Sequence, residues 1–201
     1  MRETYYIGKY VVSDGSKPVD NVLTKPIEWI ALEENAGKTL LISRDVLDWE
    51  LYDDDVVTWG NSYLKRYLND LYESYFTSEE KSAICDTPHG KLFLLSEEEL
   101  NKYFPTEIDK RAIMNIYEVD KEGNKSIFIE HHTYWVRTDE IDELEDELPA
   151  MSELGNIEYY SPDADEIGVR PAMLVDSKAA RILSAQMGFN KWHHFWELDK
   201  F

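Results

Sequence analysis

Apolar and polar residues alternate along the first part of the chain in a pattern that predicts three strands followed by a helix. Residues 5–12 are rich in aromatic and β-branched side chains and end at a Ser-Asp-Gly-Ser turn signal, which is typical of a strand. Residues 27–32 and 39–43 flank a polar stretch that contains Gly37, which indicates a β-hairpin. Between residues 61 and 76, apolar side chains recur every three or four positions, which predicts a helix with one buried face.

The signals in the rest of the chain are shorter. Two capping-box patterns, Thr77 with Glu80 and Ser96 with Glu99, predict short helices, and the apolar run 92–95 suits a buried strand. We expect another short helix around residues 108–114 and strands at 134–137, 156–160 and 169–175. Apolar positions at helical spacing predict a helix over residues 178–187. The aromatic tail 189–201 is expected to pack on the body, because exposed aromatic surface promotes aggregation.

Together these elements predict a single α+β domain with a twisted, mostly antiparallel sheet and flanking helices. No internal repeat or long linker divides the 201 residues, and 43% hydrophobic residues are enough to build a core. We therefore assign residues 1–176 to the domain and residues 177–201 to a C-terminal helix and aromatic tail packed on it.

Acidic residues dominate the charge of the chain. The sequence has 41 Asp and Glu against 21 Lys and Arg, for a formal net charge of -20. Such a surface repels phosphate backbones and anionic lipids, so we expect neither nucleic acid nor a membrane as a partner. This charge would attract a basic protein as a partner. The alternative is that the acidic surface only keeps the protein soluble and has no partner. The sequence does not indicate an oligomeric state.

Cysteine use and the N-terminal residues bear on the compartment. Cys85 is the single cysteine, so no intramolecular disulfide can form and no thiol pair can hold a metal. The first residues lack the apolar core of a signal peptide, and no apolar run is long enough to span a bilayer. We expect a soluble, cytoplasmic protein.

The sequence predicts no metal or cofactor site. The five histidines include two adjacent pairs, and neighbouring residues on a strand point to opposite faces, so neither pair can chelate from regular geometry. Residues 163–168 begin like a calcium loop, but Ile167 occupies a ligand position and Leu174 stands where the closing glutamate belongs. The chain also lacks a GxSxG motif, a glycine-rich phosphate loop and an HExxH motif, which disfavours an enzyme.

Five polar or aromatic residues in apolar surroundings are expected to be structural, not catalytic. They are Trp59, Asn69, Trp135, Arg137 and Arg170. A desolvated guanidinium is costly unless it finds carboxylate or carbonyl partners, so we expect both arginines to bond such groups inside the domain.

The acidic segment 139–147 is the candidate recognition surface. Its seven carboxylates create a local field that would steer a basic partner, and neighbouring tyrosines would anchor it. A solvated loop without a partner is the alternative. The candidate ligand-binding residues are Asp139, Glu140, Asp142, Glu143, Tyr159 and Tyr160.

A series of short motifs also resembles a known family. The segments are Ile7-Gly8-Lys9-Tyr10, Pro26-Ile27-Glu28-Trp29-Ile30, Leu40-Leu41-Ile42-Ser43, Thr58-Trp59, Phe93-Leu94-Leu95-Ser96, Trp135-Val136-Arg137 and Gly168-Val169-Arg170-Pro171-Ala172. In order and spacing they resemble the bacterial domain-of-unknown-function family numbered 6273. The resemblance implies a fold similar to formylglycine-generating enzymes and C-type lectin-like domains. The acidic segment and the residues beyond Asp176 depart from the family pattern, and the single cysteine argues against the copper oxidase activity of formylglycine-generating enzymes, which needs a cysteine pair.

Two functions remain open at this stage. The first is a non-catalytic binding module that recognises a protein or glycan ligand through loops on a rigid scaffold. The second is an acidic immunity or inhibitor-type protein that masks a basic effector by charge complementarity. An enzyme is less favoured than either.

Overall fold

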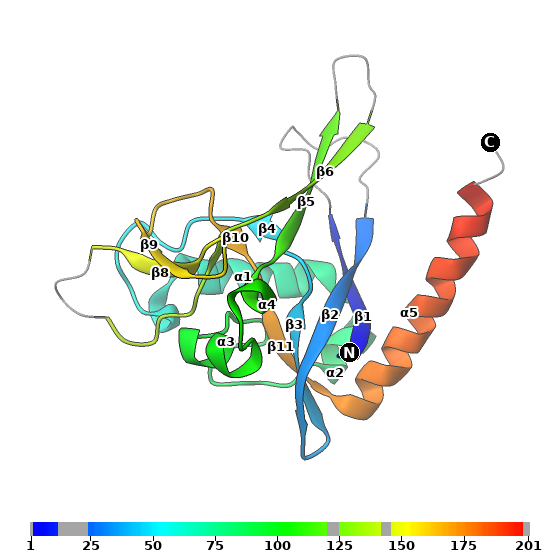
Figure 1. Cartoon of the computed structure of the whole chain (residues 1–201). Helices are drawn as coiled ribbons and strands as arrows, with labels where there is room; N and C mark the ends of the chain where they lie inside the picture. The colour runs from blue at the N-terminus through cyan, green and yellow to red at the C-terminus, as the bar shows by residue number, and fades with distance from the viewer. Residues whose placement is uncertain (1, 12–23, 120–124, 142–145, 199–201) are drawn as a thin grey trace.

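The computed structural model describes residues 2–11, 24–119, 125–141 and 146–198, and it shows a mixed α+β protein (Figure 1). The first sheet contains, in spatial order, β1 (Thr4–Val11), β2 (Thr24–Asn35), β3 (Lys38–Ser43) and β11 (Ala172–Asp176), and all its pairings are antiparallel. The predicted hairpin is confirmed. Its strands are longer than predicted because Ala36 and Gly37, both with positive φ, make a two-residue turn.

The second sheet is built from short strands that are far apart in the chain. In spatial order they are β4 (Asp48–Trp49), β10 (Gly168–Val169), β7 (Tyr134–Trp135), β8 (Leu148–Met151) and β9 (Ile157–Tyr160). The β10–β7 pair is parallel and the other pairs are antiparallel. A two-stranded hairpin, β5 (Ile113–Val119) and β6 (Lys125–His131), projects from the body (Figure 1).

The α+β class and the mostly antiparallel pairing are therefore confirmed, but the described strands are divided among three hydrogen-bonded sheets. The predicted strand 169–175 is divided between two of them, with Arg170 and Pro171 at the crossing. Proline has no N–H to donate to a ladder, so a break at this position is physically reasonable.

The helices follow the sequence signals closely. Helix α1 (Tyr63–Tyr75) follows a 3-10 turn, η1 (Trp59–Asn61). Its N-cap is Ser62, whose hydroxyl oxygen accepts a hydrogen bond from the Lys65 backbone N–H. Helices α2 (Ser78–Ala83) and α3 (Glu97–Tyr103) each carry the predicted capping box in full. The helical periodicity and the caps were therefore sufficient to place these three elements.

Two local predictions are wrong. The short helix expected at 108–114 is only α4 (Glu107–Lys110), and β5 begins at Ile113 because the hairpin with β6 uses these backbone groups. The run 92–95 is buried but is not a strand. Phe93 pairs with Ala172 in an isolated bridge, whereas the Leu95 carbonyl accepts from the Arg137 N–H, so no single neighbouring strand forms a ladder with this run.

Helix α5 (Ser177–Leu198) follows β11 directly and runs beside β1 (Figure 1). It is longer than the predicted 178–187. The packing expected of the aromatic tail falls on side chains after Met187 and on residues 199–201, which lie outside the described part of the structure. No helix in the described residues combines the length and apolar character needed to cross a membrane.

One connected cluster of buried hydrophobic side chains fills the interior. It takes residues from both larger sheets and from α1, including the fully buried indoles of Trp29, Trp59 and Trp135. Trp135 and Val169 were both expected to be buried, and both are. This core holds the second sheet, whose edge strand β4 carries the candidate site.

Candidate functional site

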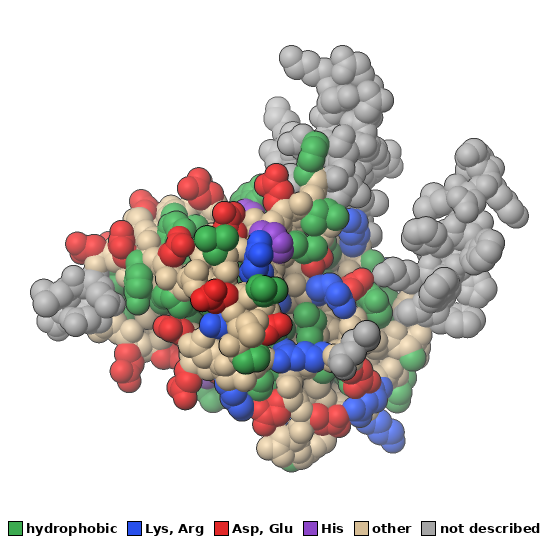
Figure 2. Space-filling model, viewed as in Figure 1, with side chains coloured by type: hydrophobic (Ala, Val, Ile, Leu, Met, Phe, Trp, Pro, Cys, Tyr) green, Lys and Arg blue, Asp and Glu red, His purple; other side chains and the backbone are tan. Residues whose placement is uncertain are grey.

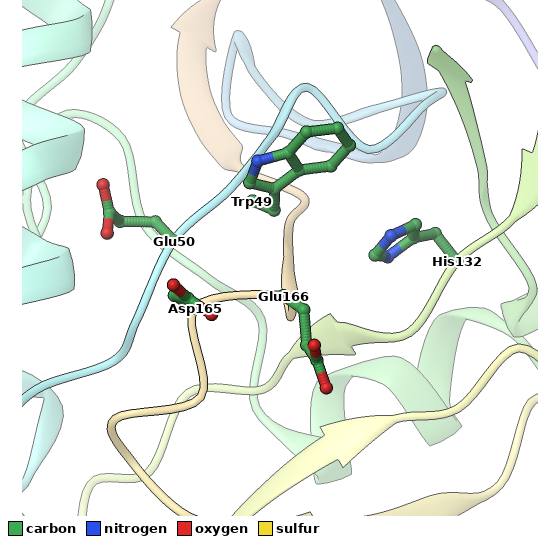
Figure 3. A pocket seen from close by; sticks show the side chains of 5 residues that line it. All are labelled: Trp49, Glu50, His132, Asp165 and Glu166. Carbon is green, nitrogen blue, oxygen red and sulfur yellow. The ribbon is translucent and has the colours of Figure 1, made fainter. Parts of the chain in front are cut away.

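An open hollow of about 540 Å³ lies beside strand β4 (Figure 3). Three separate segments supply its lining: β4 and the residue after it, the β6–β7 connection, and the β9–β10 loop. The lining residues are Trp49, Glu50, His132, Asp165 and Glu166.

Two aromatic rings form one wall of the hollow. The centroids of the Trp49 and His132 rings are 6.2 Å apart, and their planes are inclined by 26°, so the two faces are nearly parallel. Trp49 is 38% exposed, which is high for an indole in a folded domain. In the described residues its indole N–H makes no hydrogen bond, so both a ring face and a donor are open to a ligand.

The backbone beneath this wall is firmly held. The Trp135 indole donates to the Glu50 carbonyl at 2.7 Å, and the Glu50 N–H donates to the Ile167 carbonyl at 3.0 Å. The Trp49 N–H donates to Asp48 Oδ1 at 3.0 Å. The exposed indole therefore stands on a rigid strand, which favours recognition without a large loss of entropy.

Because Gly168 has no side chain, the segment that carries His132 can pack closely against β10. A Cβ at this position would lie 2.5 Å from Val46 Cγ1, 2.7 Å from the Thr133 carbonyl oxygen and 3.3 Å from His132 Nδ1. The Thr133 carbonyl accepts from the Gly168 N–H at 2.8 Å and lies 2.8 Å from His132 Nδ1. Since a carbonyl only accepts, Nδ1 carries the proton in this contact and Nε2 is the ring nitrogen left for a ligand.

The three carboxylates of the hollow differ in their surroundings. Glu50 Oε1 accepts from the Leu51 N–H at 3.1 Å, and Glu50 Oε2 lies 3.4 Å from the Tyr63 hydroxyl. Figure 3 shows the Glu50 carboxylate turned away from the two rings. Asp165 and Glu166 are exposed, and neither side chain has a hydrogen bond or ion pair with any described residue.

Two further carboxyls, Asp48 in β4 and Asp45 shortly before it, are partly buried and accept hydrogen bonds from neighbouring side chains. The Tyr67 hydroxyl donates to Asp48 Oδ2, and Asn115 Nδ2 donates to Asp45 Oδ2 at 2.9 Å. Burial raises the pKa of the Asp48 carboxyl, and the hydrogen bond from Tyr67 opposes this only in part. Burial likewise raises the pKa of Asp45, against the opposing bond from Asn115.

The raised pKa of Asp48 predicts a particular pH dependence. Because the folded state binds this proton more tightly than the unfolded chain, the group makes folding more favourable as the pH falls from neutral toward about 4. Relative to an Asp48→Asn variant, which does not titrate there, the wild-type protein should gain thermal stability as the pH falls from 7 toward about 4. Melting curves at several pH values measure this, and parallel profiles for the two proteins would contradict it.

The residues predicted for recognition are only partly brought together. Tyr160 pairs with Leu148, so the end of the acidic segment does lie beside the tyrosines on the edge strand β9. Tyr159 is 54% exposed, and Glu140 is exposed. Asp142 and Glu143 lie outside the described residues.

Asp139 has an internal role that the sequence did not reveal. Its Oδ2 accepts from Arg137 Nε at 2.8 Å, and Arg137 Nη1 reaches both the Leu94 carbonyl at 2.9 Å and Glu99 Oε2 at 3.0 Å. The His89 ring lies 3.8 Å from the other Asp139 oxygen. This carboxylate is therefore engaged by a buried arginine, although its side chain is 47% exposed.

The residues expected in the core divide into two groups. Trp59, Trp135, Arg137 and Arg170 are buried, and both guanidinium groups have the internal partners expected of them. The expectation for Asn69 is wrong, because it lies on the exposed side of α1. Its apolar neighbours in sequence face the core on the other side of the helix.

None of the five residues that line the hollow was predicted from sequence alone to belong to a binding site. Trp49 is an indole between two carboxylates, Asp48 and Glu50, and an aromatic residue in such a polar setting is a signal that could have been used. His132 and the 163–168 segment were considered only as metal ligands. Within the described residues, no group of three or more His, Cys, Asp or Glu side chains is arranged to hold a metal ion.

Comparison with known families and structures gives one match. The family described as "Domain of unknown function (DUF6273)" matches residues 36–177, which contain every residue of the hollow and both arginine motifs. The match begins at the β2–β3 turn, so β1 and β2 lie outside it. No curated protein and no solved structure matches the chain.

Proposed function

The chain belongs to the DUF6273 family, and we propose that it is a non-catalytic binding module that recognises a protein or glycan ligand through the Trp49 hollow. We further propose a C-type lectin-like arrangement, in which irregular loops carry recognition residues on a rigid sheet. The observation that supports the proposal best is the exposed Trp49 indole beside two carboxylates without internal partners.

The composition of the hollow supports recognition. Binding sites commonly combine an aromatic surface with a few polar groups that fix the orientation of the ligand. Here the aromatic surface is the Trp49 and His132 pair, and the polar groups are Asp165, Glu166 and the free indole N–H. All of them stand on strands or on a loop anchored to strands, which limits the entropy lost on binding.

Binding is favoured over catalysis because Asp45 and Asp48, the two carboxyls whose pKa is raised, are not available to a ligand in the hollow. Asp48 accepts hydrogen bonds on both oxygens, from Tyr67 and from the Trp49 backbone, and Asp45 does not line the hollow. A general acid or base must reach the proton that it transfers. Neither carboxyl is placed to do so at the hollow.

The acidic immunity or inhibitor function has its own support. Asp and Glu side chains gather over the part of the surface formed by β8, β9 and their loops (Figure 2). Asp146, Glu147, Glu158 and Tyr159 are exposed there. Such a surface would accelerate encounter with a basic protein and make the association sensitive to salt.

The proposed function is tested by retention of ligands from an extract of the native cell. Immobilised wild-type protein should retain a defined set of proteins or glycoconjugates, and Trp49→Ala should lose them because the aromatic surface is gone. Ile108→Ala removes an apolar side chain that is 77% exposed outside the hollow, and it should retain the wild-type set. Equal retention by all three proteins, or none by the wild type, would contradict the proposal.

A further inference from the structure

We infer that the hollow binds a guanidinium group, the side chain of an arginine on a basic protein partner. This inference rests on the proposed function and specifies its ligand. The guanidinium would lie against the Trp49 and His132 faces and donate hydrogen bonds to the Asp165 carboxylate, beside the negative charge of Glu166. Figure 3 shows these two residues on the chain segment that passes below the rings, with the Glu166 side chain directed away from the rings.

The charge of the lining favours a cation over a neutral ligand. Among the described residues, three carboxylates line the hollow and no Lys or Arg does. Some exposed carboxylates elsewhere are paired within the chain, as in Glu33 with Lys102 at 2.7 Å and Glu34 with Arg181 at 2.6 Å. Asp165 and Glu166 have no such partner in the described structure, so a positive group from another molecule would neutralise them.

The aromatic wall favours guanidinium over ammonium. Guanidinium is planar and weakly hydrated, so it stacks on an aromatic face at a smaller desolvation cost than a lysine ammonium. The protein already uses this arrangement in its interior. The Arg170 guanidinium lies 5.2 Å from the Tyr134 ring centroid and 5.4 Å from that of Phe104 while its N–H groups bond oxygen atoms.

The carboxylates of the hollow suit the hydrogen bonds that a guanidinium donates. The N–H groups of a guanidinium form a planar fork that can donate two parallel bonds to one carboxylate. The Asp165 carboxylate can accept such bonds while one face of the group remains against Trp49, and the adjacent Glu166 adds negative charge to the same loop. A sugar would also stack on the indole, and its hydroxyls can donate to carboxylates, but a sugar carries no positive charge to neutralise them, so the charge separates the two ligands.

Titration with single small molecules tests the inference without the multivalent attraction that a polycation would feel. The probes are N-acetyl-arginine amide, its neutral isostere N-acetyl-citrulline amide, and methyl glucoside. The readout is the Nε1–H resonance of Trp49 in the 15N-labelled full chain, identified by its loss in Trp49→Phe. We expect the arginine probe to shift this resonance saturably and the other two probes to leave it in place.

Charge-matched variants locate the contact. Asp165→Asn with Glu166→Gln should weaken binding of the arginine probe by about five- to tenfold, because charge-assisted bonds are lost. Glu97→Gln with Glu98→Gln removes the same charge from exposed positions on α3, away from the hollow, and should leave binding unchanged. Equal weakening by both pairs would mean that only the overall field attracts the probe, and would overturn the inference.

The remaining outcomes separate the inference from the proposed function. A shift with methyl glucoside and none with the arginine probe would overturn the guanidinium site while supporting a glycan-binding module. Equal shifts with the arginine and citrulline probes would show that charge is not recognised, and would also overturn it. If no probe moves the resonance and ligand retention is independent of Trp49, both the inference and the proposed function fail.

Discussion

Replacement of Arg170 by alanine should lower the free energy of unfolding by about 3 kcal/mol, because several buried oxygen atoms would lose their donor together. The guanidinium donates to the carbonyls of Ser43, Lys110 and Arg44 at 3.1, 3.1 and 3.4 Å, and to the Tyr134 hydroxyl at 3.1 Å. The side chain is 3% exposed, so water cannot replace these bonds without opening the core. Chemical denaturation monitored by tryptophan fluorescence measures the change.

A matched arginine provides the control. Arg181 on α5 forms an ion pair with Glu34 at 2.6 Å, but it is 45% exposed and its partner can be solvated when the pair is lost. Arg181→Ala should therefore leave the unfolding midpoint nearly unchanged. Similar destabilisation by the two substitutions would show that Arg170 acts through its charge alone and not through the buried bonds.

Replacement of Gly155 by alanine should also be strongly destabilising, by about 3 kcal/mol or more, because two separate costs combine. The φ of Gly155 is +90°, which an L-residue rarely adopts. A Cβ there would lie 2.0 Å from the Glu107 carbonyl oxygen and 2.6 Å from its carbonyl carbon, and these backbone atoms cannot rotate away as a side chain can. Thermal and denaturant unfolding of the purified variant measure the loss.

Two other glycines separate these costs. Gly37 has a φ of +77°, and a Cβ added there would meet no other atom within 4 Å. Gly37→Ala should therefore show only the cost of the unfavourable backbone conformation, about 1 kcal/mol. Gly168 is not among the positive-φ residues but is closely surrounded, so Gly168→Ala should show the steric cost and should also disturb the Trp49 hollow. If Gly155→Ala were no worse than Gly37→Ala, the β8–β9 turn would be free to move away from α4.

The buried arginines and the tight glycine explain why the sequence motifs around them are informative. Arg170 bonds the end of β3 and the end of α4, and Gly168, two residues earlier, lies against the His132 connection. Trp135 supports Glu50, and Arg137, two residues later, gathers Asp139 and Glu99. Each motif therefore joins segments that are distant in the chain, and the contacts of Gly168 and Trp135 hold two of the segments that line the hollow.

The sequence by itself determined the elements whose information is local. Helix α1, the two capping boxes and the β2–β3 hairpin depend on contacts between residues a few positions apart, and all of them could be predicted from spacing and turn chemistry. The mixed α+β class and the burial of Trp135 and Val169 followed from the apolar pattern together with the family resemblance. The family match over residues 36–177 includes helix α1, both capping boxes, strand β3, Trp135 and Val169.

Only the tertiary structure decided how the short strands are shared among sheets and which polar residues meet at the hollow. A two-residue strand such as β4 or β10 carries almost no periodicity of its own, and its partners are set by backbone bonds between distant segments. For the same reason Trp49, His132 and Asp165 could not be grouped from sequence, and Asp139 could not be recognised as the partner of a buried arginine. Local patterns encode local hydrogen bonds, whereas a binding surface depends on long-range packing that no short window of sequence contains.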